Sequence, residues 1–296
     1  MAFRQRVKHL FLGSFGFLLV FLTFGPMSHA AVTVDYQDYY RVAYQQGSQA
    51  HIIRQSVAQF TQECQHELGP EYVKYVKSGG NDSFPAYAKL NYYGQVDPGV
   101  AGSKPQTIMM NFTYKSISPH IIRKNTSSYH MRTGDILICH GGGSSGSIGG
   151  IPGHAALVNS SGYILEMPGA NFGYKRKHNA HKTSKKLFFK RYLDKKTSHI
   201  EVYRLKHKTV AKKAAQYAYY HMYKKHNPKY GIFSGINLYA TSPSYCSKYV
   251  YLAYYRGYHH KTVSKHSNWY FVTPYGLVGN FKKAYKPTHI FSIKHF

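Results

Sequence analysis

The sequence predicts an α+β domain, and two patterns support this prediction. Between residues 134 and 205, short apolar segments bordered by turn-forming residues have the length of β-strands. Two longer segments follow, residues 209–225 and 246–257, in which apolar residues recur at helical spacing. Strands that are close together in sequence and then followed by a helix are typical of an antiparallel sheet packed on that helix.

Each strand is justified by its apolar content and by the turns at its ends. A glycine- and serine-rich loop, residues 141–153, separates the first two strands, and a turn at 159–162 joins the second and third as a hairpin. The basic, histidine-rich residues 175–196 are predicted to be an exposed insertion. In chain order, the predicted strands are GDILIC (134–139), HAALV (154–158), YILEM (163–167), HIEVYRL (199–205), part of WYFVTPYGLV (269–278) and IFSI (290–293).

The N-terminal part is predicted to be a mostly helical extension of unknown role, residues 31–125. Apolar residues recur along one side of a helix predicted over residues 51–68, and Gly69-Pro70 is predicted to end it. A second short helix is predicted over residues 71–77. The main domain is then predicted to span residues 126–296.

Residues 1–30 have the pattern of a secretory signal peptide. Three basic residues precede an apolar run over residues 10–24, and a small-residue cleavage site, Ser28-His29-Ala30, follows. The apolar run is short for a bilayer span and is interrupted by glycine, which favours cleavage over a membrane anchor. The mature protein is therefore predicted to be secreted or associated with the cell surface.

The chain is strongly basic, with 39 lysine and arginine residues against 11 aspartate and glutamate residues, a formal net charge of +28. Removal of the signal peptide takes away three basic residues and leaves +25. Such a charge predicts an anionic partner. Export argues against nucleic acid and favours an anionic cell-wall polymer, a peptidoglycan substrate or the headgroups of a membrane surface. The alternative is a charge that serves only solubility, and the oligomeric state does not follow from the sequence.

Cys246 lies where a helix is predicted to begin. Ser244 can cap this helix by accepting a backbone N–H, and Gly257 marks its end. The positive end of the helix dipole favours the thiolate, which is the form of cysteine that attacks carbonyl carbon. Cys246 is therefore the candidate nucleophile, and its alternative interpretation is a small buried core residue. Cys139 is the rival nucleophile, Cys64 is predicted to be a core residue, and a disulfide between these two is left open.

His154 is the candidate base because it opens a short strand directly after the glycine-rich loop, where its ring would lie at the mouth of a cleft. Glu166 is the candidate group that orients this ring. A three-residue hairpin loop, residues 160–162, would pair Ala156 with Glu166 and place Glu166 on the face of His154. A two- or four-residue loop would send Glu166 to the opposite face. Glycine at the third loop position favours the three-residue loop.

The segments GDIL, GHAALV, ILEMPG and YCSKYVYLAYY, with VTPYGL downstream, resemble the circularly permuted NlpC-type (YiiX-like) cysteine hydrolases, which have a papain-like fold. In that branch the histidine strand precedes the cysteine helix. The resemblance covers about residues 126–296 and implies Cys246 as nucleophile, His154 as base and Glu166 as the third polar group. It also implies a tyrosine at the oxyanion site, which Tyr230 matches, and Tyr245 is a further candidate for oxyanion or substrate contact. The 141–153 loop and the 175–196 segment depart from the family pattern and leave the substrate open.

Rival motifs are less specific. Residues 142–146 fit the G-x-S-x-G pattern of serine esterases, but the strand and helix that this motif needs are not predicted around it. Paired histidines, His178 with His181 and His259 with His260, lack further ligands at metal-binding spacing, so no metal or cofactor is predicted.

The sequence thus predicts a secreted cysteine peptidase or amidase that cleaves an amide bond, with peptidoglycan peptides as the leading substrate. Two alternatives remain. One is a lipid or ester acyl hydrolase that uses the same three residues. The other is a non-catalytic cationic protein that binds the cell wall.

Overall fold

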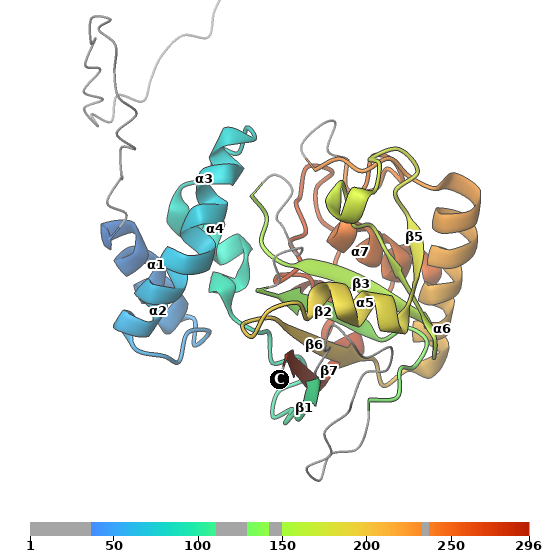
Figure 1. Cartoon of the computed structure of the whole chain (residues 1–296), viewed down its shortest axis with the longest axis horizontal. Coiled ribbons are helices and arrows are strands. Elements are labelled where there is room, and N and C mark those ends of the chain that lie inside the picture. Colours follow the sequence, from blue (N-terminus) through green and yellow to red (C-terminus); the bar gives the residue numbers. More distant parts are fainter. Residues whose placement is uncertain (1–36, 111–128, 142–149, 233–236, 296) are drawn as a thin grey trace, which may run out of the picture. The chain divides into compact units, whose positions relative to one another are not determined.

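A seven-stranded mixed β-sheet organises the part of the chain that the structure describes, residues 37–110, 129–141, 150–232 and 237–295 (Figure 1). In this computed structural model, Tyr36–Phe296 form one compact unit. The predicted signal peptide and the predicted domain boundary at residue 125 lie outside the described residues. The strand order is β1-β7-β6-β2-β3-β4-β5. The bounds are β1 (Gln106–Met110), β2 (Ile136–His140), β3 (His154–Ser160), β4 (Tyr163–Glu166), β5 (His181–Ser184), β6 (His199–Arg204) and β7 (Thr288–His295).

The prediction of an antiparallel sheet is wrong at one edge. Strands β7, β6, β2, β3, β4 and β5 pair antiparallel in that order, but β1 pairs with β7 in parallel. Strand β1 comes from the N-terminal part of the chain and joins the last strand, so no hairpin turn fixes its direction. Only tertiary packing could decide this pairing.

The strand predicted within residues 269–278 is also wrong, because residues 270–273 are irregular and residues 274–277 form a turn. The backbone N–H of Val272 donates to the hydroxyl of Tyr245 (3.2 Å), so this segment is held by a side chain instead of a neighbouring strand.

Helices pack on both faces of the sheet (Figure 1). Ile136 and Ile138 of β2 belong to the core that also contains residues of α6 and α7, whereas Leu137 and Cys139 belong to the core under α5. This alternation is the period of two that a strand imposes on its side chains. The three helices are α5 (Lys185–Tyr192), α6 (Lys208–Tyr217), which continues as the π-helix η4 (Ala218–His226), and α7 (Cys246–Gly257).

Helix α7 is the most enclosed of these helices, since every residue from 246 to 255 is buried. Gly257, its last residue, lies against α6, where an added Cβ would come within 2.7 Å of the Cα of Ala214. The predicted end of this helix at Gly257 is therefore confirmed. The glycine is needed because the two helices approach closely at this point.

The N-terminal part is helical, as predicted, but its helices are divided differently. Ser56 and Gln59 form a capping box that starts the second helix, and Gly69-Pro70 begins a helix where it was predicted to end one. The backbone is helical through Leu68 and Gly69, and the N–H of Gly69 donates to the carbonyl of Cys64, so α3 continues directly from the π-helix before it. The helical segments are α1 (Gln37–Gln49), α2 (Val57–Glu63), the π-helix η1 (Cys64–Leu68), α3 (Gly69–Lys77), α4 (Phe84–Leu90) and the 3₁₀ turn η2 (Tyr92–Gly94).

These N-terminal helices contact the segments that border the candidate site. The hydroxyl of Tyr275 donates to Glu67 (2.5 Å), and the hydroxyl of Thr273 donates to the backbone carbonyl of Leu90 (2.6 Å). Tyr87 donates to the carbonyl of Gly150 (2.7 Å), just before β3. The N-terminal helices thus help to hold two loops that lead to the site. No helix among the described residues is long and apolar enough to cross a membrane.

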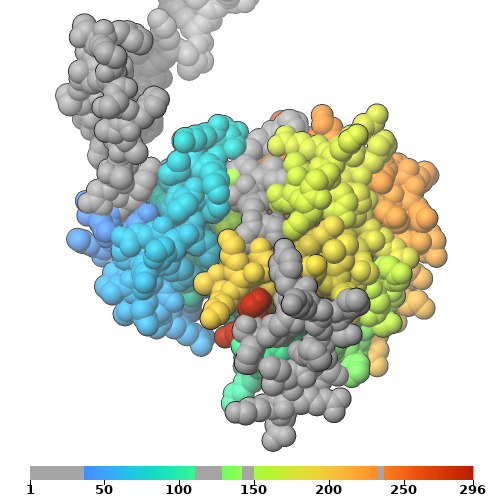
Figure 2. Space-filling view, in the orientation of Figure 1, coloured from blue at the N-terminus to red at the C-terminus, as the bar shows by residue number. Residues whose placement is uncertain are grey.

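Residues 175–196 are not simply an exposed insertion, so this prediction is corrected. They contain strand β5, which pairs with β4, and helix α5, whose Phe188, Phe189 and Tyr192 are buried against the sheet. Figure 2 shows why the prediction was partly reasonable, because these yellow-green and yellow residues also form part of the surface. The sequence did contain a signal for this amphipathic helix. Phe188, Phe189 and Tyr192 are spaced i, i+1 and i+4, and they follow Ser184, which caps the helix.

Candidate active site

Cys246 is the first residue of α7, as the sequence predicted. The residue that caps the helix is Tyr245, however, with extended backbone angles and no side-chain capping bond, so the prediction of Ser244 as the N-cap is wrong. Ser244, one residue before the N-cap, is held by two backbone hydrogen bonds instead. Its N–H donates to the carbonyl of Lys229, and its carbonyl accepts the N–H of Gly231 (both 2.9 Å). Cys246 follows this extended segment and therefore lies at the positive end of the helix dipole.

His154 is the first residue of β3 and is buried, with only 5% of its surface exposed. The preceding Gly153 has a positive φ of 79°, and an added Cβ would come within 2.3 Å of the Tyr275 ring and 2.9 Å of the Cys139 carbonyl. Only glycine fits this close turn. The turn places the imidazole at the end of the strand, where the chain leaves the glycine-rich loop.

The hairpin between β3 and β4 puts Glu166 on the histidine face by a different route from the one predicted. Its turn has two residues, Ser161 and Gly162, because Ser160 pairs with Tyr163. A β-bulge between Val158 and Ser160 then shifts the register by one residue, so that Leu157 pairs with Leu165. The bulge restores the register expected for a three-residue loop. The predicted loop was therefore wrong, whereas the predicted face of Glu166 agrees with the structure.

Cys246, His154 and Glu166 meet in one buried cluster. Nε2 of His154 donates to Oε2 of Glu166 (3.1 Å), and His154 and Cys246 line the same pocket, where each shifts the pKa of the other. Since Nε2 is used by Glu166, Nδ1 is the nitrogen left for the thiol. The order thiol, imidazole and carboxylate is the order that activates a cysteine nucleophile.

The surroundings favour a thiolate beside an imidazolium. Burial raises the pKa of the Cys246 thiol, but the hydrogen bond and charge of His154, with the N–H groups of Ala155 and Ser247, bring it below its ordinary value. Burial lowers the pKa of His154, but Cys246 and Glu166 outweigh burial and raise it to about 9. A lowered pKa of the thiol and a raised pKa of the imidazole both favour the thiolate–imidazolium pair over the neutral pair.

Glu166 is fully buried and is held by residues that sequence reasoning did not identify. The hydroxyl of Tyr192 donates to its Oε2 (2.8 Å) and that of Thr183 to its Oε1 (2.5 Å), while Arg191 lies 4.0 Å from Oε1. Burial raises the pKa of Glu166, but these hydrogen bonds and His154 lower it below its ordinary value. The Tyr192 ring also stacks on the imidazole, with centroids 4.6 Å apart. All three supporting residues come from the segment that was predicted to be an insertion.

Tyr230 and Tyr245 both line the pocket at Cys246 but have different roles. Burial, followed by the charge of Cys246, raises the pKa of the Tyr230 phenol well above the ordinary value. It therefore stays protonated and able to donate. The hydroxyl of Tyr245 instead accepts the N–H of Val272, and its ring stacks on Phe271 at 4.7 Å. Tyr245 shapes the pocket wall.

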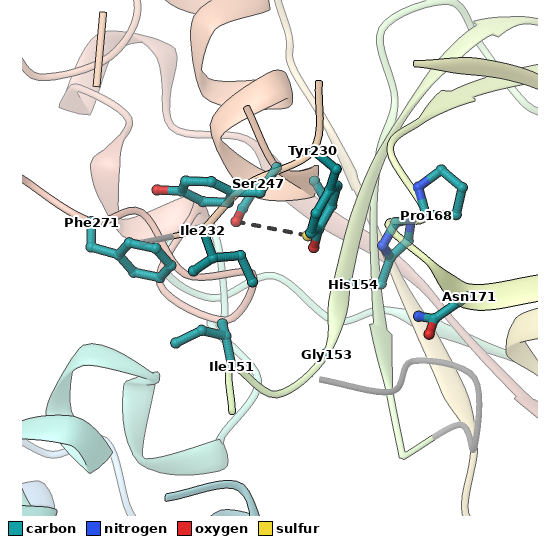
Figure 3. A pocket seen from close by; sticks show the side chains of 11 residues that line it. Ile151, Gly153, His154, Pro168, Asn171, Tyr230, Ile232, Ser247 and Phe271 are labelled. Carbon is teal, nitrogen blue, oxygen red and sulfur yellow. Dashed lines mark hydrogen bonds between the residues drawn. The ribbon is translucent and has the colours of Figure 1, made fainter. Parts of the chain in front are cut away.

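Figure 3 shows the pocket formed by these residues, with His154 and Tyr230 near the sulfur and Ile151, Ile232 and Phe271 forming an apolar side. Ser247 lies 4.0 Å from the sulfur through its Oγ and donates to the carbonyl of Val272. The cavity volume is about 10 Å³, roughly the space of one water molecule.

The other two cysteines do not have this setting. All three cysteines lie in the described residues and are free thiols, so Cys64 and Cys139 are not joined. Burial raises the pKa of both Cys64 and Cys139 well above the ordinary thiol value. Among the described residues, no three His, Cys, Asp or Glu side chains are placed to hold a metal. The esterase-like motif at residues 142–146 lies outside the described residues.

An α+β sheet on which a cysteine at a helix start meets a histidine and a glutamate defines a cysteine hydrolase-type protein. Comparison with known proteins supports this class. Residues 104–292 match the family described as "Lipoprotein N-acylation protein LnsA-like", which belongs to the papain/NlpC-like cysteine hydrolase-type clan. The match covers more than half of the chain, and the protein therefore belongs to this family.

A relative with similar extent is the "Uncharacterized 30.3 kDa protein" of Bacillus thuringiensis. It is 30% identical over 299 aligned residues, which cover 95% of this chain and 98% of the relative. The alignment therefore includes the N-terminal helices as well as the sheet. No solved structure matches the chain. The family suggests acyl-transfer or hydrolase-like chemistry and an association with the cell envelope. The permuted NlpC-type branch is narrower than this clan and stays a prediction.

Proposed function

We propose that this protein is a thiol-dependent acyl-transfer enzyme in which Cys246 forms an acyl thioester. The observation that carries the proposal is the pocket that Cys246 shares with His154, whose imidazole is held by Glu166. In the first step the thiolate attacks the carbonyl carbon of an ester or amide, and His154 gives its proton to the leaving alcohol or amine. In the second step His154 takes a proton from an incoming amine or water, which attacks the thioester and releases Cys246.

The negative oxygen that develops in both steps needs donors beside the sulfur. Two groups are placed for this role. The backbone N–H of Cys246 belongs to the first turn of α7, where N–H groups have no partner within the helix. The hydroxyl of Tyr230 lies beside the thiol and stays protonated, because burial raises its pKa.

For the substrate, we propose a lipid-derived acyl group that is transferred to an amine. The family description names N-acylation of lipoproteins, and the apolar pocket side of Ile151, Ile232 and Phe271 suits a hydrocarbon chain. The amide cleavage in peptidoglycan peptides predicted from export and charge would use the same thioester step. It differs only in the acyl donor and acceptor. The two proposals can therefore be separated by substrate.

The test is intact-protein mass spectrometry of the mature chain after incubation with phosphatidylglycerol vesicles or, separately, with purified cell walls. The proposal expects a mass increase of one fatty acyl group with vesicles, lost on treatment with hydroxylamine, which cleaves thioesters. Adding a peptide with a free N-terminal amine should then move the acyl group to the peptide. New muropeptides with walls, and no acyl adduct with vesicles, would favour the peptidase instead.

The matched variants are Cys246→Ala and Cys139→Ala. Both remove a buried free thiol from the same region. Cys246 opens a helix and shares a pocket with His154, whereas Cys139 lies opposite His154 on strand β2, outside that pocket, and burial raises its pKa. Cys246→Ala should form no adduct, whereas Cys139→Ala should form it as the wild type does. An adduct that persists in Cys246→Ala, or absence of any thiol-dependent product on either substrate, would overturn the proposal and leave the non-catalytic binding protein.

A further inference from the structure

A second pocket, with a cavity volume of about 470 Å³, lies away from Cys246 and has a basic lining. It lies beside the connection from β6 to α6 and beside strand β7. None of its lining residues lines the pocket at Cys246. Its size falls within the range of pockets that hold small organic ligands. The lining includes four cationic residues beside the Asp135–Arg204 pair, Arg132, Lys206, Lys208 and Lys212, together with three apolar ones, Leu205, Ala211 and Ile290.

The one carboxylate of this lining, Asp135, is already neutralised. Arg204 binds it through two bonds, from Nε to Oδ1 (2.7 Å) and from an Nη to Oδ2 (2.6 Å). The hydroxyl of Tyr129 (2.8 Å) and the N–H of Arg132 (2.9 Å) also donate to Oδ2. Asp135 is 1% exposed, so its carboxylate is buried and bound by these donors, which hold the pocket wall in place. The four remaining cations therefore have no acidic partner within the lining.

The arrangement of these cations works against the stability of the helix on which two of them lie. The first turn of α6 contains no acidic residue, and its N-cap, His207, makes no side-chain capping bond. Lys206 and Lys208 flank that cap, and Lys212 lies one turn further along. Cations at the positive end of a helix dipole are unfavourable. An anion in the pocket would remove this repulsion.

We propose that this pocket binds a phosphate-bearing anion, with the phosphate held by Arg132, Lys206, Lys208 and Lys212 and the organic part against Leu205, Ala211 and Ile290. Arginine and lysine side chains are the groups that proteins use for phosphate, and the apolar residues between them suit a ligand with a carbon skeleton. The phosphate can belong to a lipid headgroup at a membrane or to a free small molecule. The proposal does not depend on the acyl-transfer proposal, because the two pockets share no lining residue.

The test uses the full mature chain with two probes, free glycerol 3-phosphate and vesicles of phosphatidylglycerol mixed with phosphatidylcholine. Binding of the free probe is measured by calorimetry, and binding of vesicles by co-sedimentation at fixed ionic strength. The variant is Lys208→Ala/Lys212→Ala. Its matched control is Lys195→Ala/Lys196→Ala, which removes the same charge from exposed positions between α5 and β6. Alanine is favourable in helices, so the α6 variant should fold, and thermal unfolding checks this.

The proposal expects Lys208→Ala/Lys212→Ala to weaken binding of at least one probe by about tenfold or more, because two charge-assisted contacts are lost. The Lys195→Ala/Lys196→Ala control should stay within about twofold of the wild type, since distant exposed charges are screened by salt. Loss with the free probe identifies a small phosphate ligand, and loss with vesicles alone identifies a lipid headgroup. Equal losses in both double variants would show attraction by net charge only and would overturn the proposal, as would no loss in either.

A further measurement, acylation of Cys246, tests the two proposals separately. Acylation of Cys246 by a soluble acyl ester should be unchanged in Lys208→Ala/Lys212→Ala, because these lysines lie outside the pocket at Cys246. Absence of acylation in the wild type would count against the proposed function alone. Loss of phosphate binding confined to the α6 variant would still support the second pocket.

Discussion

Two buried histidine–glutamate pairs lie on opposite faces of the same sheet, and they differ in what stands beside the histidine. His154 binds Glu166 through Nε2 at 3.1 Å, and His289 binds Glu201 through Nε2 at 2.5 Å. Each imidazole stacks on a tyrosine, at 4.6 Å on Tyr192 for His154 and at 4.8 Å on Tyr203 for His289. Each glutamate also accepts from a hydroxyl side chain. The two pairs therefore have nearly the same set of contacts.

The difference is the thiol. His154 lies at the end of its strand and shares a pocket with Cys246, the first residue of α7. The described hydrogen bond and ring contacts of His289 are to Glu201 and Tyr203, and none of the three cysteines is among them. The two pairs therefore differ in whether a thiol shares a pocket with the imidazole.

The largest expected difference is between the two histidines. His154→Gln should lower acylation of Cys246 by about 10²- to 10⁴-fold, because it removes the group that takes and returns the proton. His289→Gln should leave the rate within a few-fold and instead lower the free energy of unfolding. Rates of acyl-adduct formation and urea unfolding curves measure the two effects. A comparable loss of rate in His289→Gln would break the distinction between the pairs.

The reactivity of the three thiols should differ by about 10²-fold or more near pH 7. The pKa of Cys246 is lowered by His154, whereas burial raises the pKa values of Cys64 and Cys139. Iodoacetamide should thus label Cys246 first in the folded protein, as peptide mass spectrometry would show. Labelling should persist below pH 9, because the pKa of His154 is about 9 and its positive charge remains there. In His154→Gln the thiol loses this charge, so labelling should need a higher pH.

Exchange of each glutamate for glutamine tests the orienting role. Glu166→Gln should slow acylation by about tenfold to a hundredfold, since a charged hydrogen bond of about 1.5–3 kcal/mol holds the imidazolium. Glu201→Gln has the same change in charge and shape but lies at the pair without a thiol. It should change the unfolding midpoint and leave the acylation rate close to that of the wild type. Equal rates for the two variants would remove Glu166 from the mechanism.

The smallest expected effect concerns the two stacked tyrosines. Tyr192→Phe keeps the ring against His154 but removes the bond to Glu166, so acylation should slow by about two- to tenfold. Tyr203→Phe removes a buried hydroxyl that donates to the carbonyl of Asp97, and it should leave the rate unchanged. Both variants should lose a similar amount of stability in urea unfolding. A larger rate effect in Tyr203→Phe would mean that packing alone controls the site.

Much of the candidate site could be predicted because its signals are local. Cys246 opens a helix, His154 opens a strand after a glycine turn, and both features can be read from adjacent residues. The position of Glu166 was predicted on the correct face, although a two-residue turn and a bulge replaced the expected loop. In contrast, Arg191 and Tyr192 were missed because basic residues surround the three buried aromatic residues of α5 in the sequence. Thr183 was missed because it lies on the short strand β5, directly before that helix.

By itself, the sequence determined the strands of the central hairpin, the helix that carries Cys246 and the chemistry available to a thiol beside an imidazole. These depend on periodicity, turn residues and side-chain type, which act over a few neighbouring positions. The tertiary structure alone decided the parallel pairing of β1 with β7, the support of Glu166 by α5 and the contact of the N-terminal helices with the site. Each of these joins segments far apart in the chain, and such contacts are set by packing and burial, which no local pattern records.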